Sequence, residues 1–290
     1  MRALVTGGVG FVGTNLIKRL LKDGYDVTSL DNYSTGFREN EQKGCTYIHG
    51  DVIEMEFWSD RLEKMDIVPD VIFHLAALAR IQPSIRNPKP PIDINFNGTL
   101  NILEYARNNN IQVIYAGSST KHHGVFNSPY AWSKYGGEQL CELYSKVYDL
   151  NTTICRFYNV YGKNHIRTGE YATVVGIFED LFKKNKSLTI TSDGEQRRDF
   201  THVVDIVDAL VKCIGKDFRA EEFELGRGVN YSINDIANMF GIDYPKKYID
   251  ERPGEYPETL CEDKNAFEKL EWKADRNIED YITKWLGENK

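Results

Sequence analysis

The N-terminal stretch, residues 2–18, joins a short apolar run to an amphipathic segment through a glycine-rich turn. The run Ala-Leu-Val at residues 3–5 is typical of a buried strand, and the apolar side chains after the turn recur at helical spacing. The turn contains Gly7, Gly10 and Gly13. Such glycines permit a tight turn, let backbone N–H groups approach a pyrophosphate, and let the helix lie close to the sheet. Strand, glycine turn and helix in this order predict a dinucleotide-binding site.

Strands and amphipathic helices alternate along the first half of the chain. After the first strand, further strands are expected at residues 25–30, 46–50, 71–75, 113–116 and 152–155, and a long helix at 92–107. Regular alternation implies an α/β fold with a Rossmann-type, doubly wound parallel sheet. Ligands of such sheets bind beyond the carboxyl ends of the strands.

Composition limits the class of protein. The chain has 290 residues, 41% of them hydrophobic and 27% charged, which is ordinary for a soluble globular protein. A net charge of −7 argues against a nucleic-acid or anionic-membrane partner. No apolar run approaches the length of a membrane span, and the first strand leaves no room for a signal peptide. The five cysteines are scattered without metal-ligand spacing, so we expect a cytoplasmic protein without a metal.

Acidic residues after two of the strands indicate which dinucleotide binds. Asp31 ends the second strand about twenty residues past the glycines, where a carboxylate accepts both ribose hydroxyls and repels a 2′-phosphate. This favours NAD over NADP. Asp51 has two open roles, one as a partner of the adenine amino group and one as a helix cap. The expected cofactor-binding residues of this half are Gly7, Gly10, Phe11, Val12, Asp31, Asn32, Asp51, Val52, Leu75, Ala76 and Ala77.

A tyrosine and a lysine follow the fifth strand at helical spacing. Tyr130 and Lys134 are four residues apart and therefore share one helix face. A phenol has an ordinary pKa of about 10, and a nearby ammonium or a positive nicotinamide ring favours the phenolate. Ser119 or Thr120, at the end of the fifth strand, can share the proton with the tyrosine. We therefore predict that these four residues are catalytic and that Tyr130 and Lys134 also contact the cofactor.

Taken together, these motifs resemble the extended short-chain dehydrogenase/reductases, in the nucleotide-sugar epimerase/dehydratase branch. The resemblance covers nearly the whole chain. It rests on Thr6-Gly7-x-x-Gly10-x-x-Gly13, Asp31-Asn32, Asp51-Val52, His74-Leu-Ala-Ala77, Tyr130-x-x-x-Lys134, Arg156-Phe-Tyr-Asn-Val-Tyr-Gly162, Asp193-Gly-Glu-Gln-Arg-Arg-Asp-Phe-Thr-His-Val203 and Arg252-Pro-Gly-Glu255. It implies bound NAD, a nucleotide-diphosphate sugar as substrate, with UDP-sugars favoured, and transient oxidation at C4 of the sugar. The matching tyrosine is then the base, the lysine holds the nicotinamide ribose, and the serine or threonine binds the reacting hydroxyl.

The second half of the chain is expected to bind the substrate. The resemblance places Tyr158 near the nicotinamide and Asn159 near the sugar diphosphate. Arg198 and Arg252 are predicted to hold the diphosphate, because an arginine fork matches phosphate oxygens. Helices are expected at residues 171–182 and 205–214.

These assignments divide the chain into two regions. An NAD-binding Rossmann domain is expected at residues 1–160, with 196–215 packing back on it. The nucleotide-sugar-binding region is expected at 161–195 and 216–290. The resemblance also implies a homodimer, formed through the helices that follow Asn95 and Tyr130.

The chain departs from the family's pattern between the fifth strand and Tyr130. The loop over residues 121–129 is short, so the sugar pocket is either more open or closed by other residues. Dehydratases carry two carboxylates where this chain has Thr120 and Lys121, and a hydroxyl and a cation cannot replace them. This leaves 4-epimerisation as the leading hypothesis. The alternatives are a 3- or 5-epimerase, a keto-reductase, less favourably a dehydratase, and a non-catalytic NAD-binding sensor. His122 and His123 either contact the sugar or only fill the space left by the short loop.

Overall fold

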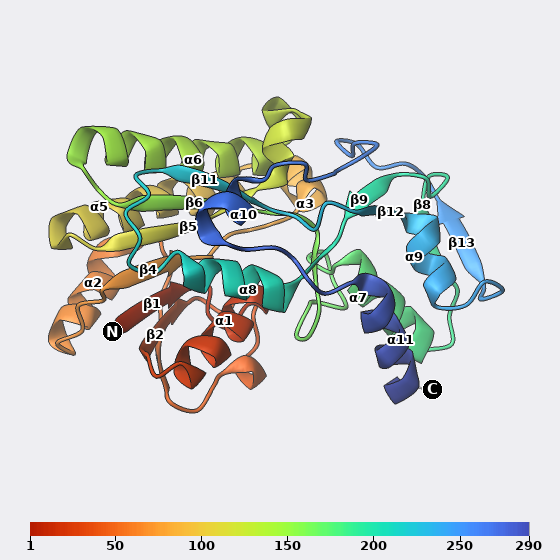
Figure 1. Ribbon diagram of the computed structural model, residues 1–290, viewed down its shortest axis with the longest axis horizontal. Coiled ribbons are helices and arrows are strands. Elements are labelled where there is room, and N and C mark those ends of the chain that lie inside the picture. The colour runs from red at the N-terminus through yellow and green to blue at the C-terminus, as the bar shows by residue number, and fades with distance from the viewer. Residues whose placement is uncertain (290) are drawn as a thin grey trace.

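The computed structural model describes residues 1–289 and consists of a large sheet flanked by helices, with a smaller lobe beside it (Figure 1). The large sheet has seven strands in the order β11-β6-β5-β4-β1-β2-β3, and every neighbouring pair is parallel. Its strands are β1 (Arg2–Thr6), β2 (Asp26–Asp31), β3 (Cys45–His49), β4 (Val71–His74), β5 (Gln112–Ser118), β6 (Thr152–Phe157) and β11 (Glu221–Leu225). This arrangement confirms the predicted Rossmann-type fold and brings the carboxyl ends of all its strands to one edge.

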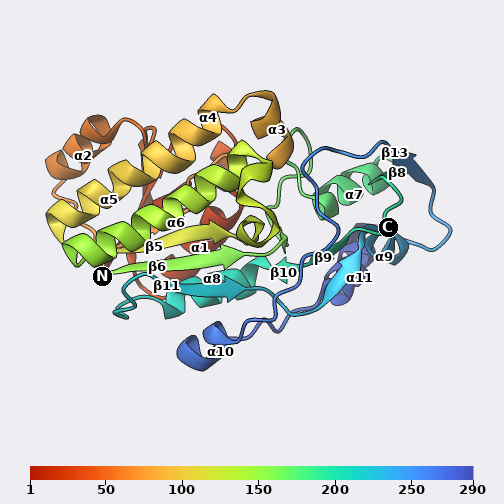
Figure 2. The same ribbon diagram turned by 90° about the horizontal axis from the view of Figure 1, so that it is seen from above.

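Helices cover both faces of the large sheet because its strands are apolar on both sides. In β1, Ala3 and Val5 face one core and Leu4 faces the other, as the two-residue period of a strand requires. Helices α1 (Phe11–Lys22) and α8 (Val203–Lys212) lie on the first face, and α2 (Met55–Lys64), α5 (Gly98–Asn109) and α6 (Pro129–Tyr148) lie on the second (Figure 2). Helix α8 therefore returns to the large sheet from a later part of the chain.

The helix expected at residues 92–107 is interrupted. The chain instead forms α4 (Lys89–Ile92), a π-helical segment (Asp93–Asn97) and α5. Buried Asn95 accepts a hydrogen bond from the N–H of Leu78 at 2.8 Å, and its Nδ2 donates to Ser133 Oγ at 3.0 Å. Widened turns of this kind are frequent at functional sites. Here Asn95 ties the loop after β4 to helix α6.

The edge strand β11 corrects the predicted division of the chain. It lies within residues 216–290, which the sequence assigns to the nucleotide-sugar region, yet it pairs in parallel with β6. Phe223 and Leu225 of this strand are buried in the core that α1 and α8 cover, and helix α10 (Asn265–Leu270) packs on the same core. Three glutamates in five residues mask the apolar alternation of β11 in the sequence.

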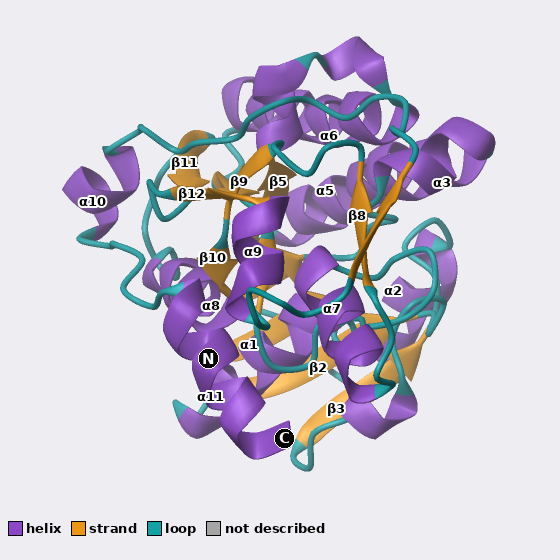
Figure 3. Ribbon diagram, turned by 90° about the vertical axis from the view of Figure 1, so that its right-hand side faces the viewer, coloured by secondary structure: helices purple, strands orange, loops and turns teal. Residues whose placement is uncertain are grey.

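The smaller lobe has its own apolar core and faces the viewer in Figure 3. Its helices are α7 (Val174–Lys183), α9 (Ile233–Met239) and α11 (Ile278–Asn289), and its strand pairs are β8 (Leu188–Thr191) with β13 (Lys246–Ile249), and β9 (Arg197–Asp199) with β12 (Asn230–Ser232). A further pair, β7 (Val160–Tyr161) and β10 (Thr201–His202), lies between lobe and sheet. Helix α7 begins at Val174 rather than at residue 171 because Thr173 Oγ1 accepts from the N–H of Gly176 at 3.1 Å. No helix within residues 1–289 has the length and apolar character to span a bilayer.

Candidate active site

A cavity of about 830 Å³ lies where the carboxyl ends of the large sheet face the smaller lobe. Every residue that the sequence predicts to be catalytic, cofactor-binding or substrate-binding lines this cavity, with the exception of Tyr158. The cavity also receives residues that the sequence did not single out, among them Ser118, Arg80 and Tyr256.

The glycine-rich segment that joins β1 to α1 has no room for a side chain at Gly7 or at Gly13. Gly7 has a φ of +73°, and a Cβ on it would lie 2.9 Å from the backbone nitrogen of Ala76. A Cβ on Gly13 would lie 2.2 Å from the carbonyl oxygen of Gly7. Helix α1 begins at Phe11, so its first N–H groups have no acceptor within the helix. These residues line the cavity, which makes the turn suitable for a phosphate group.

Two carboxylates lie at the far end of the same cavity, after β2 and β3. Asp31 is held in place because its carboxylate accepts hydrogen bonds from the N–H groups of Val9 at 3.0 Å and Tyr33 at 2.8 Å. Burial raises the pKa of Asp31, and these two N–H groups oppose that effect. Asp51 accepts from Asn32 Nδ2 at 2.7 Å and from the N–H of Ile53 at 3.2 Å. Asp51 therefore caps the following turn and also lines the cavity.

The hydroxyl of Tyr130 meets a serine at the end of β5. Tyr130 Oη lies 3.2 Å from Ser118 Oγ, and Thr120 Oγ1 donates to the same Ser118 Oγ at 2.9 Å. The sequence predicts Ser119 or Thr120 as the partner of Tyr130, whereas the structure places Ser118 there. Ser119 and Thr120 are both buried and line the cavity. The run of three hydroxyl residues marks this strand end in the sequence, but not which of them faces the tyrosine.

The charges around Tyr130 differ from those expected. Burial raises the pKa of Tyr130, while the hydrogen bond with Ser118 and the positive charge of Arg80 act in the opposite direction. The sequence predicts that Lys134 lowers the pKa of Tyr130, and no such effect of Lys134 is found. The Lys134 ammonium instead lies 4.1 Å from the ring centre of Tyr115. Burial also lowers the pKa of Lys134 to about 8.

The buried lysine predicts an unusual pH dependence of stability. The native pKa of Lys134 is about 8, and an unfolded lysine has a pKa of about 10.4. Between these values the unfolded chain binds more protons, so the free energy of unfolding should rise with pH, by at most roughly 3 kcal/mol. Urea unfolding of the cofactor-free protein and of Lys134→Met at pH 7 to 10.5 measures this rise as a difference between the two proteins. Parallel curves would contradict it.

The three residues expected to bind the substrate are brought together, whereas one residue expected to lie beside the cofactor is not. Asn159, Arg198 and Arg252 line the cavity, but Tyr158 does not. Phe157 and Asn159 face the cavity, so Tyr158 between them points to the opposite side, as alternation in an extended chain requires. Burial and the neighbouring carboxylate of Glu224 raise the pKa of Tyr158. Its expected place beside the nicotinamide is therefore not supported.

Arg198 is held at the wall of the cavity by its neighbours. Its Nη1 donates to the carbonyl of Arg197 at 2.8 Å, and its guanidinium lies 5.0 Å from the ring centre of Tyr256. Glu255 lies 3.7 Å from its Nη2. The remaining donors of this arginine are available for a phosphate group.

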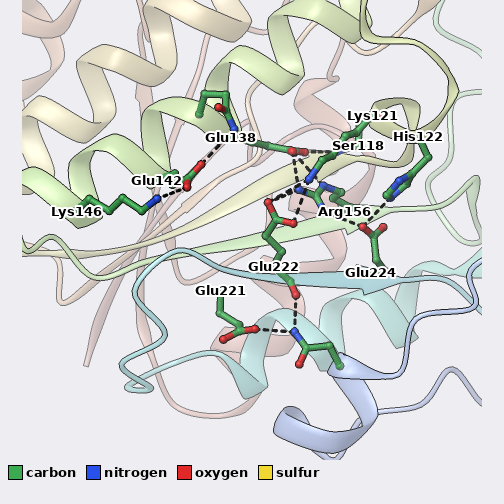
Figure 4. Close-up of polar contacts among 12 residues, drawn as sticks. Ser118, Lys121, His122, Glu138, Glu142, Lys146, Arg156, Glu221, Glu222 and Glu224 are labelled. Carbon is green, nitrogen blue, oxygen red and sulfur yellow. Dashed lines mark hydrogen bonds and ion pairs between the residues drawn. The ribbon is translucent and has the colours of Figure 1, made fainter.

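The short loop before α6 is held in place through its first three residues, and neither of its histidines lines the cavity. Lys121 Nζ lies 3.1 Å from Glu222, and His122 Nε2 lies 2.8 Å from Glu224 (Figure 4). His123 stacks on Tyr256, with the ring centres 4.2 Å apart and the planes at 15°. Because Tyr256 does line the cavity, this stack closes the side that the short loop leaves open.

An ion network around buried Arg156, which no sequence motif predicts, connects β6, α6 and β11 (Figure 4). Arg156 of β6 is 1% exposed and contacts Glu138 of α6 at 2.8 Å, Glu222 of β11 at 2.6 Å and Glu224 of β11 at 2.7 Å. Glu138 also accepts from the N–H of Ser118 at 3.3 Å. The network therefore fixes α6, which carries Tyr130 and Lys134, against the serine that meets Tyr130.

The profile of the NAD dependent epimerase/dehydratase family matches residues 3–226. The chain belongs to this family. This confirms the resemblance seen in the sequence, and NAD is the cofactor on which the epimerase/dehydratase family depends.

Individual members of the epimerase/dehydratase family match the chain over nearly its full length. It is 32% identical to the putative UDP-glucose 4-epimerase of Methanocaldococcus jannaschii, over 99% of this chain and 98% of that protein. The UDP-glucose 4-epimerase of Thermotoga maritima, solved with UDP-glucose, has a TM-score of 0.92 and 28% identity and covers 99% of both chains. The UDP-glucuronic acid 4-epimerase of Bacillus cereus, solved with UDP-glucuronic acid and NAD, has a TM-score of 0.89 and 25% identity, with 99% of both chains covered.

The site fits NAD, because a turn with no room for side chains at Gly7 and Gly13 and a fixed carboxylate at Asp31 line one cavity. We predict that Asp31→Asn lowers the preference for NAD over NADP by at least about tenfold, a change of about 1.4 kcal/mol. The reason is that the variant no longer repels a 2′-phosphate and loses an acceptor for the ribose. Calorimetric titration with both dinucleotides measures the ratio. Asp26→Asn, at the exposed start of the same strand, is the control, and an unchanged ratio in Asp31→Asn would contradict the assignment.

Proposed function

We propose that this protein is an NAD-dependent nucleotide-sugar 4-epimerase that acts through a transient 4-keto sugar. The observation that carries the proposal is the contact between Tyr130 and Ser118 inside the cavity that also contains the glycine turn. Dehydration is less well supported, because Thr120 and Lys121 occupy the two positions where an acid and a base are needed, and Lys121 is paired with Glu222.

Tyr130 is the proposed base and acid of both half-reactions. Its phenolate takes the proton of the sugar O4 as the C4–H bond breaks, and a ketone forms at C4. The chemistry that NAD would supply when bound is to accept the hydride that leaves C4 of the sugar and to give it back. Once the ketone presents its other face, Tyr130 returns the proton to O4, and the sugar leaves inverted at C4 with nothing consumed.

The residues around Tyr130 support this proton transfer. Ser118 lies within hydrogen-bond distance of the phenol and of Thr120, so the three hydroxyls form a chain that can hold the moving proton. Burial disfavours the phenolate, and the charge of Arg80 offsets this in part. Lys134, one helical turn after Tyr130, is proposed to bind the nicotinamide ribose.

The diphosphate of the substrate is proposed to lie between Arg198, Arg252 and Asn159. All three residues line the cavity. A UDP-sugar is favoured because both solved relatives described above hold one. Guanidinium forks match phosphate oxygens and outweigh the overall negative charge of the chain.

The test is direct conversion of a nucleotide sugar. The NAD-loaded protein is incubated separately with UDP-glucose, UDP-N-acetylglucosamine and UDP-glucuronate, and with their galacto epimers. Proton NMR then follows the anomeric signals in both directions. We expect at least one pair to reach the same equilibrium from either side. Failure of every pair to interconvert would count against 4-epimerisation.

A homodimer is proposed through α5 and α6. Trp132, Leu143 and Val147 are exposed along one side of α6, and their spacings of eleven and four residues keep them on the same helix face. An apolar stripe of this kind is typical of a helix that packs against another chain. Light scattering on the purified protein gives the molecular mass in solution, and a monomer would contradict this assembly.

A further inference from the structure

One of the cations that line the cavity, Arg80, pairs with no carboxylate among the described residues. Arg80 stands directly before the short helix α3 (Ile81–Arg86) and lines the cavity. Its Nη1 donates to the carbonyl of Ala79 at 2.9 Å, and no other hydrogen bond of its side chain is formed within residues 1–289. No carboxylate of those residues lies within ion-pair distance of it. A guanidinium has five N–H donors, so most of them are unused.

The acids that line the cavity are all engaged elsewhere. Asp31 and Asp51 accept hydrogen bonds from the backbone or from Asn32. Glu170 pairs with Arg86, and Glu255 is the carboxylate nearest to Arg198. The protein therefore supplies no counter-charge for Arg80. Arg80 is partly buried. Removing an arginine from water, even in part, is costly unless an anion accompanies it, so a ligand is the remaining source of that anion.

Arg80 lines the same cavity as Tyr130 and Tyr171. Its charge acts on the hydroxyls of Tyr130 and Tyr171, whereas Arg198 acts on Tyr256 and Glu255. The loop that carries Arg80 is fixed, because the N–H of Leu78 donates to Asn95. On the other side of Arg80, Gln82 Nε2 donates to the carbonyl of Pro253 at 2.6 Å. The guanidinium therefore lies on a loop that is fixed on both sides, in the cavity that also contains the hydroxyl of Tyr130.

We propose that Arg80 binds a carboxylate on the sugar, at a carbon next to C4, so that the substrates are acidic nucleotide sugars. This inference rests on the proposed function only for the orientation of the sugar, with C4 at Tyr130. A planar guanidinium matches a carboxylate with two parallel hydrogen bonds. Two kinds of sugar carry a carboxylate on a carbon next to C4. In a hexuronate the carboxyl carbon, C6, is attached to C5, and in a muramate the carboxylate is attached to C3 through an ether at O3. A neutral hexose would leave Arg80 without an anionic partner in the cavity.

The test measures binding separately from turnover. Calorimetry on the NAD-loaded protein compares UDP-glucuronate and UDP-N-acetylmuramate with UDP-glucose and UDP-N-acetylglucosamine. We expect one acidic sugar to bind at least about tenfold more tightly than its neutral counterpart, which corresponds to about 1.4 kcal/mol. Arg80→Met should abolish that preference and leave the affinity for neutral sugars within about threefold, while Arg80→Lys should restore part of it. Arg61→Met, on helix α2, is the matched control.

Two outcomes would overturn the inference. The first is equal affinity of the unaltered protein for acidic and neutral sugars, and the second is a preference that survives Arg80→Met. Tight binding of an acidic sugar without any interconversion would instead refute the epimerase proposal alone.

Discussion

Tyr130→Phe is expected to lower kcat for sugar interconversion by about 10²- to 10⁴-fold, the usual contribution of a positioned acid and base. Phenylalanine keeps the ring and removes only the hydroxyl that contacts Ser118, so the fold and the NAD site should be unchanged. The measurement is the NMR assay with whichever UDP-sugar pair the protein interconverts, together with calorimetric titration of NAD.

A second tyrosine provides the control for this prediction. Tyr25 packs against the core of the large sheet and does not line the cavity, so Tyr25→Phe should keep its turnover within about twofold, because a neutral change away from the reacting atoms alters no step. If Tyr130→Phe retains more than about a tenth of the activity, another group takes the O4 proton. If it instead loses NAD, the role of Tyr130 lies in binding.

Arg156→Met is expected to destabilise the protein by about 3–5 kcal/mol, because it leaves buried carboxylates without their cation. Glu138 and Glu224 are 1% and 7% exposed, so water cannot replace the guanidinium. The measurement is urea unfolding at pH 7.5. Lys64→Met removes the exposed pair with Asp60 and should change stability by less than about 1 kcal/mol.

The pH dependence of the Arg156→Met defect separates a charge effect from a packing effect. Burial already raises the pKa of Glu138 even with Arg156 beside it, and loss of the cation should raise it further. A carboxyl with a raised native pKa holds its proton when the unfolded chain has released it, so stability falls as pH rises above about 4.3. The deficit of Arg156→Met should therefore grow from pH 5 to pH 8. A deficit that stays constant would indicate lost packing instead.

The sequence predicts the fold and the cofactor well because both depend on patterns that are local along the chain. The glycine turn, Asp31 and the pair Tyr130 and Lys134 each lie within a short motif, and all of them line one cavity. The apolar runs of the sequence likewise predict the first six strands of the large sheet, β1 to β6. The pattern does not predict β11, because glutamates that form ion pairs with Arg156 replace the apolar residues expected in a buried strand.

The remaining differences concern the direction and surroundings of single side chains. Whether Ser118 or Ser119 faces Tyr130 depends on how β5 ends. Whether Tyr158 or its two neighbours face the cavity depends on how the side chains alternate beyond β6. The isolated position of Arg80 depends on which acids lie near it in three dimensions. None of these facts is encoded at a fixed spacing, so no motif could reveal them.

The place of β11 has a consequence for how the protein is made. As the ribosome releases the chain, β6 and Arg156 emerge about seventy residues before the carboxylates of Glu222 and Glu224, as the sequence numbering shows. Until then, the nascent dinucleotide-binding half lacks an edge strand and has an arginine in its interior with only Glu138 to balance it. Its final consolidation should therefore wait for the C-terminal third, and a fragment that ends before β11 should aggregate or be degraded rather than persist as a domain.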